Sequence, residues 1–200
     1  ERNGLEGSVF SGAGFLTLAA SQAGYASAFE IERDETCAEV FAANHPSAVV
    51  LGDIVEVALM ASRNKIALPH VDLLTAGIPC LPYARCRRGQ RIASGECVDE
   101  PETVSMAIWF AEIVKATNPY NIVIEQVEDF LETSMFVGLK GVLTLLGYHV
   151  QHAVLDANDF GLPTGRRRAV IVATTEPAPG QIERVSRSTK LIQPTAADIL

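Results

Sequence analysis

Short apolar runs alternate with longer segments of helical periodicity along most of the chain. The apolar runs are rich in Val, Ile and Leu and predict strands at residues 7–10, 25–32, 49–51, 71–75, 121–124, 148–155 and 169–173. The periodic segments predict helices over 15–23, 34–44, 104–117 and 131–146, the last stopped by Gly147. This alternation is typical of βαβ units. We therefore expect an α/β fold with a mostly parallel twisted sheet and helices on both faces, in which the last two strands are candidates for an antiparallel pair.

The composition is that of an ordinary globular domain. Of the 200 residues, 48% are hydrophobic and 20% charged, which is enough for one substantial core. No apolar run reaches the roughly 18–20 residues of a membrane span, and the first residues do not form a signal peptide. The cysteines lack CxxC or Cys/His zinc spacing, so we expect free thiols in a reducing cytoplasm, with no metal and no membrane partner. They are Cys37, Cys80, Cys86 and Cys97.

Positive charge is concentrated in two places, although the formal net charge is -8. This net charge argues against a surface that attracts nucleic acid everywhere, but it leaves room for a local basic face. One cluster comprises Arg85, Arg87, Arg88 and Arg91, and the other comprises Arg166, Arg167 and Arg168. Two interpretations stay open, namely solvated loops and sites that bind phosphate groups.

Glycines follow the first predicted strand, where a turn leads into a helix. They belong to Phe10-Ser11-Gly12-Ala13-Gly14, and such a loop lets the backbone approach a ligand at a helix N-terminus. A purely structural turn is the alternative. Glu32, after the second strand, lies at about the spacing at which a carboxylate binds ribose hydroxyls. Asp53 and Ile54 follow the third strand and suit the edge and face of an adenine, so the pattern predicts an adenosine-containing cofactor.

Pro79 and Cys80 follow the fourth predicted strand. Open α/β sheets keep their active sites at the carboxyl ends of strands, which is where this thiol lies. Nearby Arg85 and Arg87 favour the thiolate, the nucleophilic form of cysteine. A buried cysteine that acts as a small apolar side chain is the alternative.

Two further groups follow or precede apolar strands. Glu125 directly follows the predicted strand 121–124, and burying a carboxylate there costs free energy unless it is paired or functional. It is a candidate general acid or hydrogen-bond anchor, with a salt-bridged strand end as the alternative. Arg166 and Arg168 alternate along an extended segment and so point to one face, where they can converge on one anion or carboxylate.

The order of these motifs resembles the C5-cytosine DNA methyltransferase family over nearly the whole chain. The resemblance implies a Rossmann-like fold that uses S-adenosylmethionine. It assigns the cofactor site to Phe10, Ser11, Gly12, Gly14, Glu32, Asp53, Ile54 and Pro79, with Glu30 as the alternative to Glu32. It assigns the catalytic roles to Cys80, Glu125, Arg166 and Arg168, and substrate phosphates to Arg85, Arg87 and Arg88.

The implied reaction is methylation of cytosine at C5. Cys80 would add to C6 of a cytosine flipped out of double-stranded DNA, and Glu125 would bind N3 and the exocyclic amine. Arg166 would hold the O2 edge, and Arg168 would brace Glu125. The implied setting is the cytoplasm of a bacterial or phage-like host, in association with the nucleoid. A catalytically silent scaffold and a transfer-RNA methyltransferase are the alternatives.

Several positions depart from the family pattern. Ser8 stands where many members have Asp, Phe15 where many have a third glycine, and Leu81, Gln126 and Thr164 replace Gln, Asn and Gln. We expect a cofactor-binding and catalytic domain at 1–176 and an exit segment at 177–200. The exit segment would lead to a target-recognition region supplied by further residues or by a second polypeptide.

Overall fold

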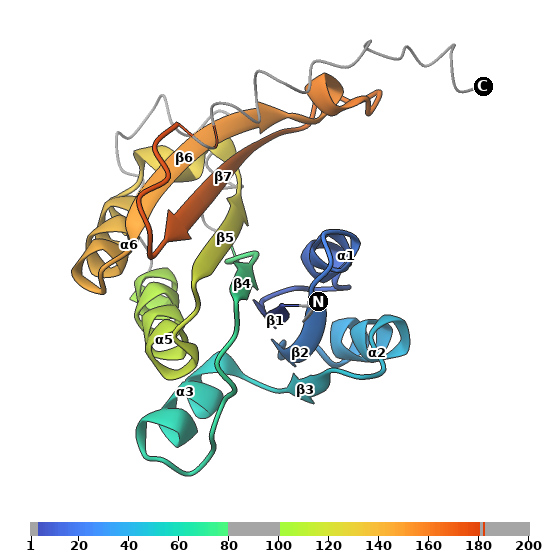
Figure 1. Ribbon diagram of the computed structural model, residues 1–200, viewed down its shortest axis with the longest axis vertical. Coiled ribbons are helices and arrows are strands. Elements are labelled where there is room, and N and C mark those ends of the chain that lie inside the picture. The colour runs from blue at the N-terminus through green and yellow to red at the C-terminus, as the bar shows by residue number, and fades with distance from the viewer. Residues whose placement is uncertain (1–3, 80–100, 181, 183–200) are drawn as a thin grey trace.

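The computed structural model describes residues 4–79, 101–180 and 182, with the backbone alone for 101–105. Its strands form one seven-stranded sheet in the order β3-β2-β1-β4-β5-β7-β6 (Figure 1). They are β1 (Leu5–Val9), β2 (Ala26–Ile31), β3 (Val49–Leu51), β4 (Leu73–Ala76), β5 (Asn121–Gln126), β6 (His149–Asp156) and β7 (Arg167–Thr174). Neighbouring strands among β1 to β5 are parallel, and β7 runs antiparallel to both β5 and β6. The expected fold class and the expected antiparallel pair are confirmed.

Helices cover both faces of this sheet. Figure 1 shows α1 (Phe15–Gln22) and α2 (Glu35–Asn44) on one side, and α3 (Ile54–Ser62), α5 (Pro101–Thr117) and α6 (Ser134–Leu145) on the other. Two 3-10 helices, η1 (Glu128–Glu132) and η2 (Ala157–Phe160), lie near the ends of β5 and β6. The parallel order of β1 to β5 follows from these crossover helices, because parallel neighbours need a long connection.

Two expected boundaries were wrong and one helix was not predicted, each for a local reason. The expected helix 131–146 is divided into η1 and α6, because Thr133 caps α6 by accepting a hydrogen bond from the Phe136 N–H at 3.1 Å. Helix α3 was not predicted, although Asp53 caps it by accepting from the Val55 N–H at 2.7 Å. The first strand ends at Val9, because Phe10 has a positive φ of 56°.

The two faces of the central strands differ in chemistry. The face toward α3, α5 and α6 is apolar, and each large side chain buried there contributes about 1.5–3 kcal/mol. Its fully buried members include Phe29, Ile31, Leu74, Phe110, Ile113, Ile122, Ile124, Leu139 and Leu143. The face toward α1 carries buried polar side chains instead, namely Glu6, Ser8, Glu30 and Thr75, with Thr17 of α1 against them.

The strand order reverses between β1 and β4, so the connections after these two strands leave in opposite directions. Open α/β sheets bind ligands in the crevice that such a reversal creates. Gly77, after β4, donates its N–H to the Val9 carbonyl at 3.2 Å. A Cβ at Gly77 would lie 3.1 Å from the Phe10 carbonyl oxygen, so the two connections pack closely where the crevice begins.

The expected exit segment begins against the sheet. The Gln151 side chain on β6 donates a hydrogen bond to the Ala178 carbonyl at 2.6 Å, and Ile182 is 6% exposed. The rest of that segment lies outside the described residues. In the described part of the chain, no helix combines the length and apolarity that crossing a membrane requires.

Candidate functional site

In the loop after β1, every second residue from Phe10 to Gly14 has a positive φ, a conformation that glycine adopts most easily. Phe10, Gly12 and Gly14 have φ values of 56°, 56° and 87°. A Cβ at Gly14 would lie 2.8 Å from the ring of Phe41, so the loop packs tightly there. A Cβ at Gly12 would meet nothing within 4 Å, so open space lies beside the loop at that residue. Phe15, where the resemblance expects another glycine, begins α1 and is 78% exposed.

Two carboxylates from the end of β2 hold this loop. The Ser11 hydroxyl donates a hydrogen bond to Glu30. Glu32 accepts from the Gly12 N–H at 3.1 Å through Oε2 and from the Asp34 N–H at 2.9 Å through Oε1. The Glu30 side chain is fully buried, and its Oε2 has no hydrogen-bond partner. Burial raises the pKa of Glu30 to about 7. The hydrogen bond from Ser11 lowers this pKa by less than burial raises it, and the nearby charges of Glu32 and Glu6 add smaller increases.

The two residues expected to contact an adenine, Asp53 and Ile54, lie at the start of α3. Asp53 is half-buried at the N-terminus of α3, where its Oδ1 caps the helix. Ile54 is 3% exposed and packs in the apolar core, so little of its side chain remains available to a ligand.

These residues fit an adenosine cofactor on two observations. A buried carboxylate oxygen without a partner, Glu30 Oε2, is an acceptor for a ribose hydroxyl. Open space beside Gly12 leaves room for a ligand to approach the backbone. Among the residues that the structure describes, no group of three or more His, Cys, Asp and Glu side chains is placed to hold a metal ion.

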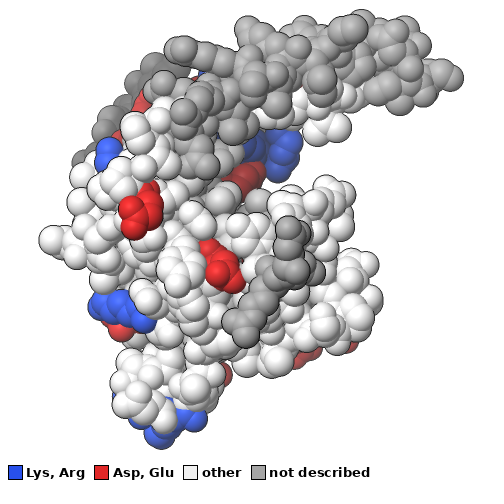
Figure 2. Space-filling model, viewed as in Figure 1, with Lys and Arg blue, Asp and Glu red and all other residues white. Residues whose placement is uncertain are grey.

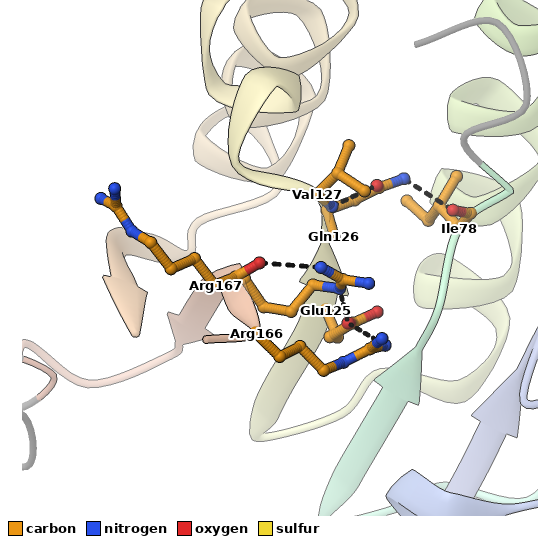
Figure 3. A network of polar contacts seen from close by, with 7 residues as sticks. Ile78, Glu125, Gln126, Val127, Arg166 and Arg167 are labelled. Atoms are coloured by element: carbon orange, nitrogen blue, oxygen red, sulfur yellow. Dashed lines mark hydrogen bonds and ion pairs between the residues drawn. The ribbon is translucent and has the colours of Figure 1, made fainter. Parts of the chain in front are cut away.

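The connection after β4 is fixed by a side chain from β5. Gln126 is 2% exposed, and its Nε2 donates a hydrogen bond to the Ile78 carbonyl at 2.6 Å (Figure 3). Its Oε1 accepts from the Val127 N–H at 2.8 Å. Pro79 follows Ile78 and is exposed. Cys80 and the cluster Arg85, Arg87, Arg88 and Arg91 lie outside the described residues.

Glu125 and two arginines form an ion-pair cluster at the same edge of the sheet. Arg168 Nε lies 2.8 Å from Glu125 Oε1, and Arg166 Nη2 lies 3.7 Å from the same oxygen (Figure 3). The Arg168 side chain is 25% exposed, against 59% for Arg166. Because β7 is antiparallel to β5, its first residues meet the last residues of β5, and the alternation of the arginines brings both to one oxygen. In the space-filling view, basic and acidic groups lie side by side in the hollowed side of the molecule (Figure 2).

Sequence reasoning missed two sets of contacts. The side chain of Arg167, between the two arginines, points away from Glu125 (Figure 3). It forms an ion pair at 2.9 Å with Glu128 of η1. Glu6 is fully buried in β1 and is contacted by Thr17 and Thr75. The signal for Glu6 was present, because a carboxylate inside an apolar strand needs partners.

Solved structures share this fold. The S. pombe Dnmt2 methyltransferase has a TM-score of 0.70 and 19% identity, and the match covers 98% of this chain and 57% of that one. The Entamoeba histolytica methyltransferase EhMeth has a TM-score of 0.66 and 18% identity, with 88% and 54% covered. The fold is that of S-adenosylmethionine-dependent methyltransferases.

Sequence comparison narrows this class to one family. A family model described as C-5 cytosine-specific DNA methylase matches residues 7–199, and the chain belongs to that family. Type II methyltransferase M.AquIA of Picosynechococcus sp. is 28% identical over 179 residues, which are 82% of this chain and 69% of the relative. Type II methyltransferase M.NgoBV of Neisseria gonorrhoeae is 28% identical over 173 residues, and the match spans 82% of this chain but 38% of that protein.

Proposed function

We propose that this chain supplies the cofactor and base-handling parts of an enzyme that methylates C5 of cytosine in DNA. The observation that carries the proposal is the meeting of Glu125 with Arg166 and Arg168 at the sheet edge that also bears the glycine loop. Family membership gives these residues a common task. The chain spans 69% of M.AquIA and 38% of M.NgoBV. Target recognition by further residues or by a second polypeptide is part of the proposal.

Glu30 is the better candidate for the ribose hydroxyls than Glu32. Glu32 already accepts backbone hydrogen bonds with both of its oxygens, whereas Glu30 Oε2 has no partner. The other oxygen, Glu30 Oε1, accepts the hydrogen bond from Ser11 in the glycine loop, which ties the carboxylate to that loop. When bound, S-adenosylmethionine supplies an electrophilic methyl group.

Cys80 is the proposed nucleophile. Its thiolate adds to C6 of the cytosine, and the electron pair of the C5–C6 double bond becomes available at C5. That pair would form the bond to the methyl carbon, while the bond from this carbon to the donor sulfur would break and leave the sulfur as a neutral thioether. Loss of the C5 proton to a base then expels the thiolate and restores the double bond. Gln126 fixes the carbonyl of Ile78, two residues before Cys80 in the sequence.

Glu125 is proposed to bind N3 and the exocyclic amine of the base. Arg168 and Arg166 both contact Oε1, which holds the carboxylate in one orientation before a base arrives. A preorganised group of this kind stabilises charge as it develops, and removing one typically costs about 100–1000-fold in rate. Arg85, Arg87 and Arg88 are proposed to bind the phosphates that flank a flipped base.

The test is Cys80→Ser in the complete protein, with transfer of a labelled methyl group measured on double-stranded DNA and on transfer RNA in parallel. We expect the parent to label DNA and Cys80→Ser to lose at least about 100-fold of this activity. Cys37→Ser is the matched control, because Cys37 is a free thiol in the first turn of α2 and has no part in the proposed addition to the base. DNA carrying 5-fluorocytosine should trap the parent covalently, because the fluorine cannot leave as a proton does. Unchanged transfer by Cys80→Ser would contradict the nucleophile, and labelling of RNA alone would contradict the DNA substrate.

A further inference from the structure

Glu6 lies in the middle of β1, with its carboxylate under helix α1. The side chain is fully buried. Its Oε1 accepts hydrogen bonds from Thr75 Oγ1 at 2.6 Å and from Thr17 Oγ1 at 3.1 Å, while Oε2 has no partner. Ser27 is its register partner on β2, and the Ser27 hydroxyl is a third polar neighbour of the carboxylate.

An apolar side chain would be the less costly occupant of this position. A buried carboxylate loses its hydration, and two hydroxyl donors restore only part of it. Burial accordingly raises the pKa of Glu6, while the contacts with Thr75, Thr17 and Ser27 lower it by less. The buried carboxylate contacts an element on each side of the crevice. Thr17 lies in the first turn of α1, and Thr75 lies in β4, two residues before Gly77.

The arrangement around Thr75 connects Glu6 to Ser8. Both residues of β1 face the same side of the sheet because they are two positions apart. Thr75 Oγ1 lies 2.6 Å from Glu6 Oε1 and 3.1 Å from Ser8 Oγ. The single hydroxyl proton of Thr75 therefore has two acceptors within reach, one at each position. The family resemblance expects a carboxylate at Ser8, and this chain has its carboxylate at Glu6.

We propose that Glu6 is a positioning residue for the two connections that follow β1 and β4, and that it replaces the carboxylate expected at position 8. It holds the first turn of α1 through Thr17 and the end of β4 through Thr75. The cofactor loop and the loop that leads to Pro79 thus share one buried anchor. The effect on cofactor affinity rests on the proposed function, whereas the effect on loop order does not.

The experiment is positional exchange in the complete protein. The variants are Glu6→Leu, the double variant Glu6→Leu/Ser8→Asp, and Thr75→Val with Thr117→Val as its matched control. Thr117 is equally buried, but its hydroxyl donates to the Ile113 carbonyl within α5, away from the crevice. The readouts are amide hydrogen exchange of the free protein and the dissociation constant of S-adenosylmethionine.

We expect Glu6→Leu and Thr75→Val to speed exchange at Gly12, Gly14 and Gly77 at least tenfold while the Asn118 amide is unchanged. The double variant should return exchange at Gly77 to within threefold of the parent, because its new carboxylate can take the Thr75 proton. Cofactor affinity should fall and recover in the same order, and Thr117→Val should leave both readouts within twofold.

Two results would overturn the inference. One is unchanged exchange at the three glycines in both Glu6→Leu and Thr75→Val, and the other is a double variant no better than Glu6→Leu. If Glu6→Leu does not fold, the isosteric pair Thr75→Val and Thr117→Val decides the question alone. A parent that binds no S-adenosylmethionine refutes the proposed function, and the exchange data still decide the role of Glu6.

Discussion

Gln126→Asn places the residue that the family pattern expects into a site built for a longer side chain. In this chain Gln126 spans from β5 to the Ile78 carbonyl at 2.6 Å and also accepts from the Val127 N–H at 2.8 Å. Asparagine is shorter by one carbon–carbon bond of about 1.5 Å. It therefore cannot reach Ile78 unless the backbone moves. We expect the conventional residue to be the poorer one here.

The magnitude follows from burial. Gln126 is 2% exposed, so water does not replace the lost contact. An unpaired buried polar group costs about 1–3 kcal/mol, and the removed methylene adds up to about 0.8 kcal/mol. We expect the free energy of unfolding to fall by about 2–3 kcal/mol, which corresponds to a decrease in Tm of roughly 4–12 °C for a domain of this size. Displacement of the connection toward Cys80 should also lower kcat by about 10–100-fold.

The assays are urea unfolding and methyl transfer at saturating cofactor, with Gln151→Asn as the control. Gln151 lies on β6, the outer strand of the sheet, and makes the same kind of contact at 2.6 Å, to the Ala178 carbonyl. Its shortening should lower stability but leave kcat within about twofold of the parent. If Gln126→Asn is as stable and as active as the parent, the argument from side-chain length is refuted. Equal loss of kcat in both variants would show a general effect of destabilisation instead.

Two further predictions concern the charged groups. Burial raises the pKa of Glu30 from 4.5 to about 7, so its contribution to stability is present below about pH 4.5 and is lost as the pH rises through about 7. The free energy of unfolding of Glu30→Gln should thus exceed that of the parent by about 1–3 kcal/mol at pH 8 but by little at pH 4.5. Urea unfolding at both pH values measures this difference, and a difference that does not depend on pH would contradict the reasoning. The same variant should bind the cofactor more weakly. Arg168→Lys should lower methyl transfer more than Arg166→Lys, because Arg168 Nε lies 2.8 Å from Glu125 and Arg166 Nη2 lies 3.7 Å away. Equal kcat losses in the two lysine variants would argue against the unequal roles.

Most strands and helices could be predicted from the sequence, because each has a local hydrophobic periodicity of its own. Residues 49–51 were predicted as a strand with the bounds that the structure shows. Helix α3 was missed because Ile54–Ser62 is apolar almost throughout, so its pattern had no polar face to reveal a helical period. The strand start at Leu5 was missed because Glu6 disfavours strands.

The candidate site was readable in part. Glu125, Arg166 and Arg168 stand out as charges at strand ends, and the antiparallel pairing of β5 and β7 brings them together. The contact from Gln126 to Ile78 joins residues 48 positions apart, which no local pattern encodes. The roles of Glu30 and Glu32 depend on which carboxylate is already hydrogen-bonded, and only coordinates supply that information.

The insertion of β7 between β5 and β6 imposes an order on assembly during synthesis. Strand β6 precedes β7 along the chain, yet its described sheet partner is β7 alone. Until β7 has left the ribosome, β5 presents an open edge, and an open edge can pair with other chains. The ion pairs of Glu125 therefore form after most of the sheet is in place. A nascent chain holds its glycine loop before it holds Arg168, so the charge cluster is among the last features of the domain to mature.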